Sequence, residues 1–329
     1  MKTHVSSDLP TIYADMNIYR YVAYGDISIE RPECFRWVYS HVHLDEIVRS
    51  KNKDALAGMR ILNAVEILDV LNENFQSIGS IRLREYLDPV VRYEQHLEAI
   101  SGLEEQSDLM VEHLLRFFGA DNFDELSLTP DKLRNEIDRL TNGLEDERRK
   151  ELLGRAEATA VEMKGTINTH LKEQHPIDQT RLKMGLTSSA RKDAEKSISP
   201  IDELWKILQP HASGIEKNQF FGFEPIPGID VQHTQHGSFA GAHMVLNLLG
   251  LSPDRSLTKR EKVKQVVSDG QHVGMASYCN GLLSADKRFC DKANAIFKHT
   301  GSYTNALWFP YKKGFVVQLG VTRSRCRAQ

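Results

Sequence analysis

Four acidic residues stand where a folded chain could bring their carboxylates together. Asp15 directly follows a short apolar run, and Asp286 lies two residues after another such run. Glu46 comes shortly after a segment rich in β-forming residues, and Asp269 lies in a segment with helical character. A charge at the end of a buried strand is costly unless a partner neutralises it. The first question is therefore what pairs with Asp15.

A divalent cation is the partner that best suits a group of carboxylates. Carboxylates that share one edge of a sheet repel each other unless a cation lies between them, and hard oxygen ligands suit Mg²⁺ or Mn²⁺. Two such ions could activate a water and stabilise the leaving oxygen in phosphodiester cleavage. Taken singly, each acid is more often a helix cap or a turn former. We expect Asp15 to bind a metal ion together with other acids.

The elements that would position these acids alternate between strand and helix at both ends of the chain. The expected strands are Ile12–Ala14, Arg36–Ser40 and Gly281–Ser284. The expected helices are Ile18–Tyr24, a helix opening at Leu44, Ala55–Leu71, Lys259–Tyr278 and Arg288–His299. Ala55–Leu71 has apolar residues at spacings of three and four, which predicts one continuous helix. Such alternation predicts an α/β fold whose site lies at the carboxyl ends of parallel strands.

The middle of the chain differs from both ends. Residues 86–172 are long, charged and helical in period, with a helix start expected at Thr129 and Pro130. Residues 173–200 are polar and predict a loop, and residues 220–230 predict turns. We therefore expect a split α/β domain at 10–85 and 256–310, a mainly α-helical insertion at 86–255, and a basic extension at 311–329.

Three segments resemble the PIN-domain family of small α/β metal-dependent nucleases. "IYADMNIY" is similar to the family's opening strand with its Asp-x-Asn, and "SHVHLDEI" is similar to its Ser-(five residues)-Glu-Leu segment. "DGQHVGMASYCNGLLSADKRF" is similar, over 21 positions, to a segment that reads Asp-x-x-His, a small residue, Cys-Asp, an apolar strand and Thr-x-Asp-x-x-Phe. The resemblance covers about 10–85 and 256–310, in the family's order. It implies a PIN-like parallel sheet with helices on both faces.

The resemblance also implies which residues form the site. The acids that match the family's metal ligands are Asp15, Glu46, Asp269 and Asp286. The residues that match or neighbour supporting positions are Asn17, Asn280, Ser284, Lys287 and Arg288. Asn280 stands where the family often has Asp and is expected only to support the ligands. Asp45, beside Glu46, would point about 100° away on a helix and is the poorer ligand.

The function that this resemblance implies is metal-dependent endonuclease activity with Mg²⁺ or Mn²⁺, on RNA more often than DNA. The cleavage would proceed without a covalent enzyme intermediate, and Lys287, Arg288 and residues 259–264 would hold phosphates. A toxin-like or defence-type role suits such a nuclease. The alternatives are a catalytically weak or inactive nucleic-acid-binding scaffold, and an interaction protein whose acidic middle binds a basic partner. The insertion would then shape substrate choice or contact a protein partner or a second copy.

The charge distribution favours a polyanionic partner. The net charge of −3 combines 16 acidic and 8 basic residues at 86–150 with 4 acidic and 13 basic residues at 259–329. A basic end of this kind suits a nucleic acid. A solvated surface that balances the acidic segment is the equally weighted alternative.

The remaining features bound the class of protein. No run of about 18 apolar residues predicts a membrane span, and no basic-then-apolar start predicts a signal peptide. The four cysteines are scattered, which favours neither a zinc ribbon nor a disulfide framework and predicts a cytoplasmic protein.

Histidine and tryptophan carry weaker indications. His233, His236 and His243 are expected to be structural. His41 and His43 could approach a substrate near Glu46, but side chains at such positions are more often satisfied polar residues. The tryptophans are expected to anchor a core or an interface, and Trp308 with Phe309 could stack on a base.

Overall fold

The computed structural model describes residues 9–73, 77–85, 87–100, 134–135, 138, 146–170, 176–227, 233–253 and 259–319. The chain divides into two compact units. One unit consists of Met1–Gly102, Gly185–Asp254 and Val266–Gln329, and the other of Leu103–Met184 and Arg255–Gln265. These units divide the chain differently from the expected insertion at 86–255, because residues 185–254 belong with the sheet.

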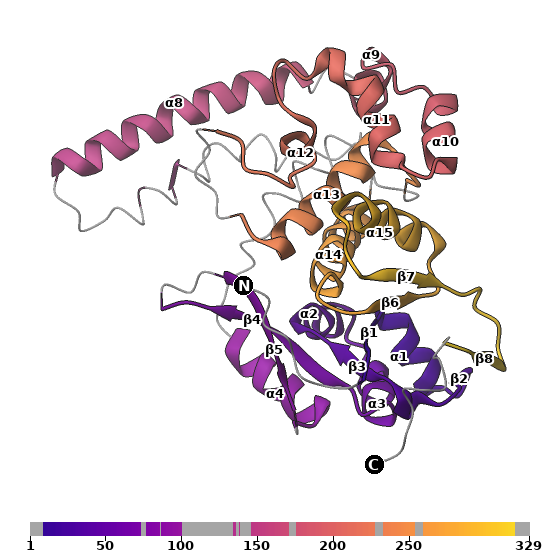
Figure 1. Cartoon of the computed structure of the whole chain (residues 1–329). Helices are drawn as coiled ribbons and strands as arrows, with labels where there is room; N and C mark the ends of the chain where they lie inside the picture. The colour runs from indigo at the N-terminus through magenta and orange to yellow at the C-terminus, as the bar shows by residue number, and fades with distance from the viewer. Residues whose placement is uncertain are drawn as a thin grey trace. The chain divides into compact units, whose positions relative to one another are not determined.

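A six-stranded sheet organises the first unit, in the order β5-β4-β3-β1-β6-β7 (Figure 1). Every neighbouring pair is parallel except β4 and β5, which are antiparallel. The mainly parallel sheet and its flanking helices confirm the predicted α/β class. The strands are β1 (Thr11–Ala14), β3 (Arg36–Tyr39), β4 (Val65–Leu71), β5 (Ser77–Arg84), β6 (Gly281–Ser284) and β7 (Asn305–Trp308).

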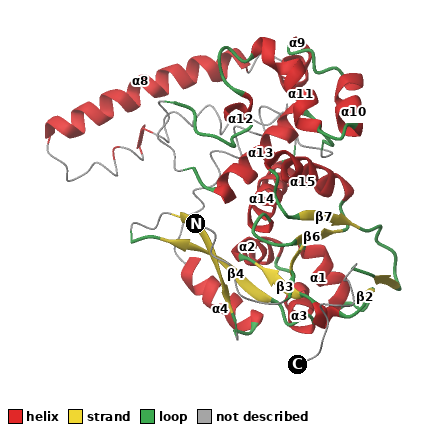
Figure 2. Ribbon diagram, in the orientation of Figure 1, coloured by secondary structure: helices red, strands yellow, loops and turns green. Residues whose placement is uncertain are grey.

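Helices flank this sheet (Figure 2). The helices of the sheet-bearing unit are α1 (Met16–Ala23), α2 (His41–Ser50), α3 (Asp54–Ile61), α4 (Pro89–Ile100), α10 (Ser188–Lys196), α11 (Pro200–Leu208), α12 (Lys217–Phe220), α13 (Gln235–Leu249), α15 (Lys287–Thr300) and the short 3₁₀ helices Pro32–Cys34 and Gln209–His211. The other unit contains α8 (Asp146–His170) and α9 (Pro176–Lys183), and α14 (Arg260–Ala276) begins in one unit and ends in the other.

The core lies along the central strands, which explains their composition. Strand β1 is apolar and its last three residues are buried, as expected when helices cover both faces of a parallel sheet. Its side chains pack with Trp37 of β3 and with Leu44 and Ile47 of α2. This packing fixes the point where β1 ends and Asp15 begins.

Helices α1 and α3 cross at unusually close range. A Cβ atom placed on Gly58 would lie only 1.9 Å from the backbone oxygen of Tyr19, so only glycine fits at this crossing. A similar approach occurs where Gly274 of α14 meets His236 of α13, with 2.6 Å to the backbone oxygen of His236. Both glycines let helices lie against each other backbone to backbone.

A second, two-stranded sheet pairs β2 (Ile27–Ile29) with β8 (Phe315–Val317) in parallel. The loop between β7 and β8 lies against the end of α1, because the Gly314 N–H donates to the Asp26 oxygen at 2.7 Å. The rings of Tyr21 and Tyr311 stack there with centroids 4.0 Å apart. This small sheet therefore ties the last described strand to the first helix.

The strand predictions at the two ends of the chain are confirmed within one residue at each boundary. The helices expected near Ile18, Leu44, Lys259 and Arg288 are also present. The single helix predicted for Ala55–Leu71 is wrong, because α3 ends at Ile61 and β4 begins at Val65. Asn63 takes a left-handed φ of 49° between them, which breaks the helix, and the following segment pairs with β3 and β5.

The loop predicted for residues 173–200 is also wrong over much of its length. Helices α9 and α10 occupy most of it, and the Thr187 hydroxyl caps α10 by accepting from the Ala190 N–H at 3.2 Å. The helix expected around residues 148–163 is confirmed within α8. The start expected at residues 129 and 130 falls outside the described residues.

Two further observations concern the class of protein. Among the residues that the structure describes, no helix has both the length and the apolar character needed to cross a membrane. Cys34 is disulfide-bonded, whereas Cys279 and Cys290 are free and buried.

Candidate functional site

Asp15 lies at the carboxyl end of the central strand β1, at the start of α1. Its backbone N–H donates to the Leu283 oxygen at 2.9 Å, and the Ser284 hydroxyl donates to its Oδ2 at 2.8 Å. Its carboxylate makes no capping hydrogen bond to α1. Burial raises the pKa of Asp15, His272 opposes that rise, and the charges of Glu46 and Asp286 add to it. The carboxylate is thus held by β6 and lies within the electrostatic reach of two other acids.

Ser284 connects two of the predicted acids. Besides donating to Asp15, its hydroxyl accepts the Asp286 backbone N–H at 3.0 Å. Ser284 is the last residue of β6 and is fully buried. The predicted supporting position of Ser284 therefore matches its contacts.

Asp286 is exposed and caps α15. Its Oδ1 accepts the backbone N–H of Arg288 at 2.8 Å and of Phe289 at 3.1 Å. One carboxylate oxygen thus performs the capping role that acids at helix starts commonly have. The same carboxylate still acts on Asp15 through its charge.

Glu46 reaches the site from α2, with 18% of its side chain exposed. Its Oε1 accepts the Ser268 hydroxyl at 2.8 Å and lies 3.4 Å from His272 Nε2 and 3.7 Å from Arg49 Nη2. Burial raises the pKa of Glu46, but the His272 charge and the hydrogen bonds from His272 and Ser268 outweigh it and lower the pKa to about 2. Glu46 is therefore ionised at neutral pH.

Asp269 lies on α14 and is half-buried. The contacts that join α14 to Glu46 come from Ser268 and His272, the residues one before and three after Asp269. The structure therefore brings Asp15, Glu46 and Asp286 into one electrostatic group and places Asp269 on the helix beside it.

A hydrogen-bond network centred on Tyr13 holds His272 in place. The Tyr13 hydroxyl lies 2.7 Å from His272 Nδ1, 2.7 Å from Ser40 Oγ and 3.3 Å from His43 Nδ1. Because Tyr13 satisfies the Nδ1 side, the Nε2 side of His272 is left facing Glu46. Tyr13, Ser40, His43 and His272 are all buried, so the network is shielded from water.

His43 is fixed in a neutral form within this network. Its Nε2 donates to the Ala14 oxygen at 2.8 Å, and its Nδ1 accepts the Ser40 N–H at 3.1 Å. Burial and the charge of His272 lower the pKa of His43 to about 3. His43 therefore supports the end of β1 as a buried, hydrogen-bonded side chain.

The other predicted residues fall in different places. Asn280 lies at the opposite end of β1, where its Oδ1 accepts the Thr11 N–H at 2.8 Å. The expectation that Asn280 supports the ligands is wrong on this geometry, because the length of β1 separates it from Asp15. Asn17 is the second residue of α1 and is half-buried. Lys287 pairs with Asp291 at 2.6 Å, and Arg288 lies in the first turn of α15.

The histidines of α13 make local contacts. The Ser238 hydroxyl lies 3.0 Å from His233 Nε2, and the ring of His236 lies 6.5 Å from that of His41. His243 is buried on the same helix as Asn247, which accepts the Lys292 ammonium at 2.7 Å. Across the described ranges, no three His, Cys, Asp or Glu side chains are spaced to bind one metal ion.

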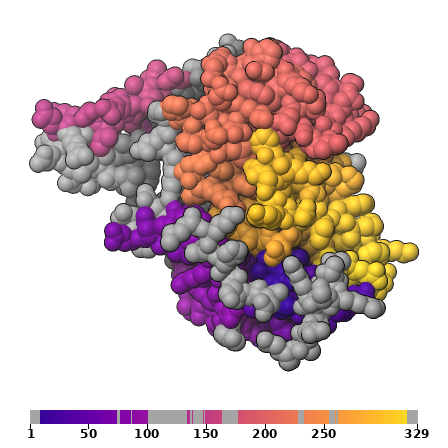
Figure 3. All heavy atoms as spheres, in the orientation of Figure 1, coloured from indigo at the N-terminus to yellow at the C-terminus, as the bar shows by residue number. Residues whose placement is uncertain are grey.

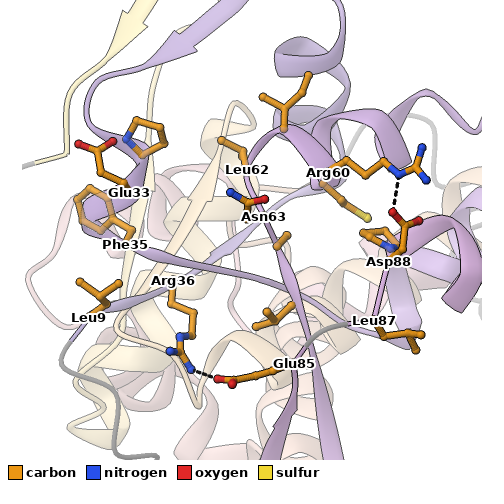
Figure 4. A pocket seen from close by; sticks show the side chains of 16 residues that line it. Leu9, Glu33, Phe35, Arg36, Arg60, Leu62, Asn63, Glu85, Leu87 and Asp88 are labelled. Atoms are coloured by element: carbon orange, nitrogen blue, oxygen red, sulfur yellow. Dashed lines mark hydrogen bonds and ion pairs between the residues drawn. The ribbon is translucent and has the colours of Figure 1, made fainter. Parts of the chain in front are cut away.

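A separate cavity of about 860 Å³ lies at the starts of β3 and β4 (Figure 4). Two ion pairs line it, Arg60–Asp88 at 2.7 Å and Arg36–Glu85. None of the predicted site residues lines it. Its cations and acids neutralise each other, in contrast to the acids around Asp15.

Comparison with protein-family models, with curated proteins and with solved structures found no match for the chain. The site must therefore be interpreted from its own geometry.

Proposed function

We propose that the chain is a metal-dependent endonuclease that acts on RNA. The observation that carries the proposal is the Ser284 hydroxyl, which holds the Asp15 carboxylate and the Asp286 backbone together. With Glu46 beside them, three acids gather at the carboxyl ends of the central parallel strands. This edge is where open α/β sheets carry their sites.

Carboxylate oxygens are the type of ligand that Mg²⁺ or Mn²⁺ prefers, although no three of them among the described residues are spaced for one ion. Asp15 has its pKa raised by burial, with the charges of Glu46 and Asp286 adding to the rise, and a cation would relieve that repulsion. Asp15, Glu46 and Asp286 would hold the ion, with Asp269 contributed by α14. A bound ion of this kind supplies a water of lowered pKa and neutralises charge on a phosphodiester.

The chain's own residues orient these acids. Ser284 fixes the direction of the Asp15 carboxylate through Oδ2. The Tyr13 hydroxyl lies 2.7 Å from His272 Nδ1, so that Nε2 faces Glu46 across 3.4 Å. The His272 charge and the Ser268 hydroxyl lower the pKa of Glu46, which keeps it ionised.

The test is cleavage of labelled single-stranded RNA and DNA with Mg²⁺ or Mn²⁺, and in EDTA. We expect metal-dependent cutting of RNA that Asp15→Asn abolishes. Asp45→Asn is the matched control for Glu46→Gln, because Asp45 neighbours Glu46 but pairs with His96 at 2.7 Å. Cutting that survives in Asp15→Asn, or that is lost equally in Asp45→Asn and Glu46→Gln, would contradict the assignment.

One observation favours a nucleic-acid-binding protein with weak or no catalysis as the second candidate. Asp286 already caps α15 through Oδ1, and over the described part of the chain no three potential ligands are spaced for one ion. This candidate predicts RNA retention that needs no metal and weakens as salt rises. Retention without cleavage under every metal condition would select it.

A further inference from the structure

An exposed tryptophan lies beside the acids on the edge strand β7. Trp308 is the last residue of that strand and is 45% exposed. Its indole Nε1 donates to the Ala285 oxygen at 3.2 Å, so the ring is anchored next to the residue that precedes Asp286. A large aromatic ring held in place yet open to solvent is positioned to take a flat ligand.

The register of the sheet fixes which side of the site Trp308 occupies. Trp308 pairs with Ser284 across the β6–β7 ladder. Paired residues of neighbouring strands point to the same face and lie about 5 Å apart. Because the Ser284 hydroxyl binds Asp15, the Trp308 side chain leaves the sheet on the face that carries the acids.

Two tyrosines extend this aromatic surface. Tyr21 and Tyr311 are stacked, and Tyr311 is 43% exposed with its hydroxyl bound to Asp26 Oδ2 at 2.9 Å. Tyr21 lies on α1, about 9 Å along the helix axis from Asp15. Figure 1 shows α1 near β6 and the segment that leads from β7 to β8. Burial and the charge of Asp15 raise the pKa of Tyr21, so this tyrosine lies within the electrostatic reach of Asp15.

The cations around these rings suit a polyanion. Lys287 and Arg288 begin α15, and Lys312 and Lys313 directly follow Tyr311. The Lys313 side chain is 82% exposed although it lies 3.3 Å from Asp26. Figure 3 shows the C-terminal strands and α15, in yellow, as one continuous part of the surface in view. Rings interleaved with cations are the pattern that binds unpaired nucleotides.

We propose that Trp308, with the Tyr21–Tyr311 stack, is a base-stacking surface that selects single-stranded nucleic acid for the site at Asp15. This inference rests on the proposed function, since it places a phosphate of the same strand at the acids. Unpaired bases expose faces that can stack on aromatic rings, whereas a duplex hides them. The surface would therefore discriminate by strandedness.

A protein strand added to the free edge of β7 is the rival occupant. The indole anchor and the flanking lysines favour a nucleic acid, because main-chain pairing needs neither. If Trp308 contributes nothing to nucleic-acid binding, the result would favour a protein strand that pairs with the edge of β7.

The test is tryptophan fluorescence of the full chain in EDTA, titrated with a 12-nucleotide oligouridylate and with a blunt RNA duplex. We expect saturable quenching by the single strand that Trp308→Phe removes, because Trp37 is buried and Trp205 lies on α11. The affinity, measured by anisotropy of a labelled strand, should fall about 5- to 150-fold in Trp308→Ala and change little in Trp308→Phe.

Tyr303→Ala is the matched control. Tyr303 is 82% exposed but lies before β7, whereas Trp308 is the last residue of that strand. Its loss should leave the affinity unchanged. Equal affinity of Trp308→Ala and the unaltered chain, or equal binding of duplex and single strand, would overturn the inference.

These outcomes are separable from those of the cleavage assay. Binding in EDTA needs neither a metal nor cutting, so an inactive chain can still show Trp308-dependent binding. A chain that cuts RNA but binds it independently of Trp308 would refute only the stacking surface.

Discussion

Two largely buried glutamates, Glu46 in α2 and Glu66 in β4, are neutralised by different kinds of partner. Glu66 Oε2 lies 2.8 Å from Arg92 Nε and 3.2 Å from Arg84 Nη1. A guanidinium keeps its charge at every pH a protein experiences. Glu46 instead has the imidazole of His272 at 3.4 Å and accepts a hydrogen bond from the Ser268 hydroxyl.

The difference separates a structural charge from a functional one. Glu66 binds the antiparallel edge of the sheet to α4 through permanent ion pairs. Around Asp15, burial and the charges of Glu46 and Asp286 act against ionisation, whereas around Glu46 the effect of burial is outweighed by His272 and Ser268. Removing Glu66 should therefore cost stability, whereas removing Asp15 should cost activity.

Asp15→Asn gives the largest expected effect. Several kcal/mol of lost charge stabilisation would slow cleavage about a thousandfold. The raised pKa of Asp15 means that its ionised form disfavours the folded state above its ordinary pKa, so the neutral amide should increase the free energy of unfolding at pH 7. The measurements are the free energy of unfolding in urea and the cleavage rate, taken on the same preparation. A variant that loses both stability and cleavage would contradict the prediction.

Glu66→Gln should have the reverse profile. Leaving two guanidinium groups without their buried carboxylate should cost about 3 kcal/mol of stability. Cleavage per folded molecule should stay unchanged, because Glu66 makes its ion pairs with Arg84 and Arg92, outside the group around Asp15. Denaturation midpoints and rates below the melting temperature provide the comparison. A specific loss of rate at full folding would show that the two regions are coupled.

His272→Gln tests the partner of Glu46 through the pH dependence of the free energy of unfolding. The pKa of Glu46 is about 2, below its ordinary 4.5, so its contribution to stability is present above pH 4.5 and lost as the pH falls through 2. Glutamine removes the imidazole charge, so the fall in unfolding free energy between pH 6 and pH 3 should shrink by about 1 kcal/mol. The measurement is urea unfolding in EDTA at both pH values. An unchanged fall would remove His272 as the cause.

Substitutions of Asp286 have the smallest expected effect on stability, and they separate its capping of α15 from its role as a site carboxylate. Asp286→Ala should destabilise α15 by about 1 kcal/mol, whereas Asp286→Ser keeps a capping oxygen and should cost less. Both variants lose the carboxylate and should lose cleavage equally. Thermal denaturation paired with activity distinguishes them. A serine variant that cleaves normally would leave Asp286 with capping alone.

The sequence predicts the parts of this site that depend on local pattern. The apolar runs of β1 and β6 predict where the chain leaves the sheet, so Asp15 and Asp286 are placed correctly at adjacent strand ends. The supporting position of Ser284 was predicted from the resemblance of its segment to a PIN-domain motif. The α/β class follows from the same alternation.

Local sequence patterns do not predict contacts between residues that are far apart in the chain. Tyr13 meets Ser40, His43 and His272 across separations of 27 to 259 residues, and nothing in its own segment indicates these partners. Asn280 was misplaced because it stands before β6, whereas Asp15 and Asp286 stand after their strands. The Asn63 break was missed because apolar spacing continues through it.

The close helix crossing at Gly58 limits which residues this position can accept. The backbone oxygen of Tyr19 occupies the space that any other residue's first side-chain carbon would need. A saturation library at this position, selected only for folded molecules, should return glycine and little else. Gly25, with open space around it and a φ of 67°, should accept asparagine in the same experiment. Much of the freedom to diversify α1 and α3 is thus limited by a single missing atom.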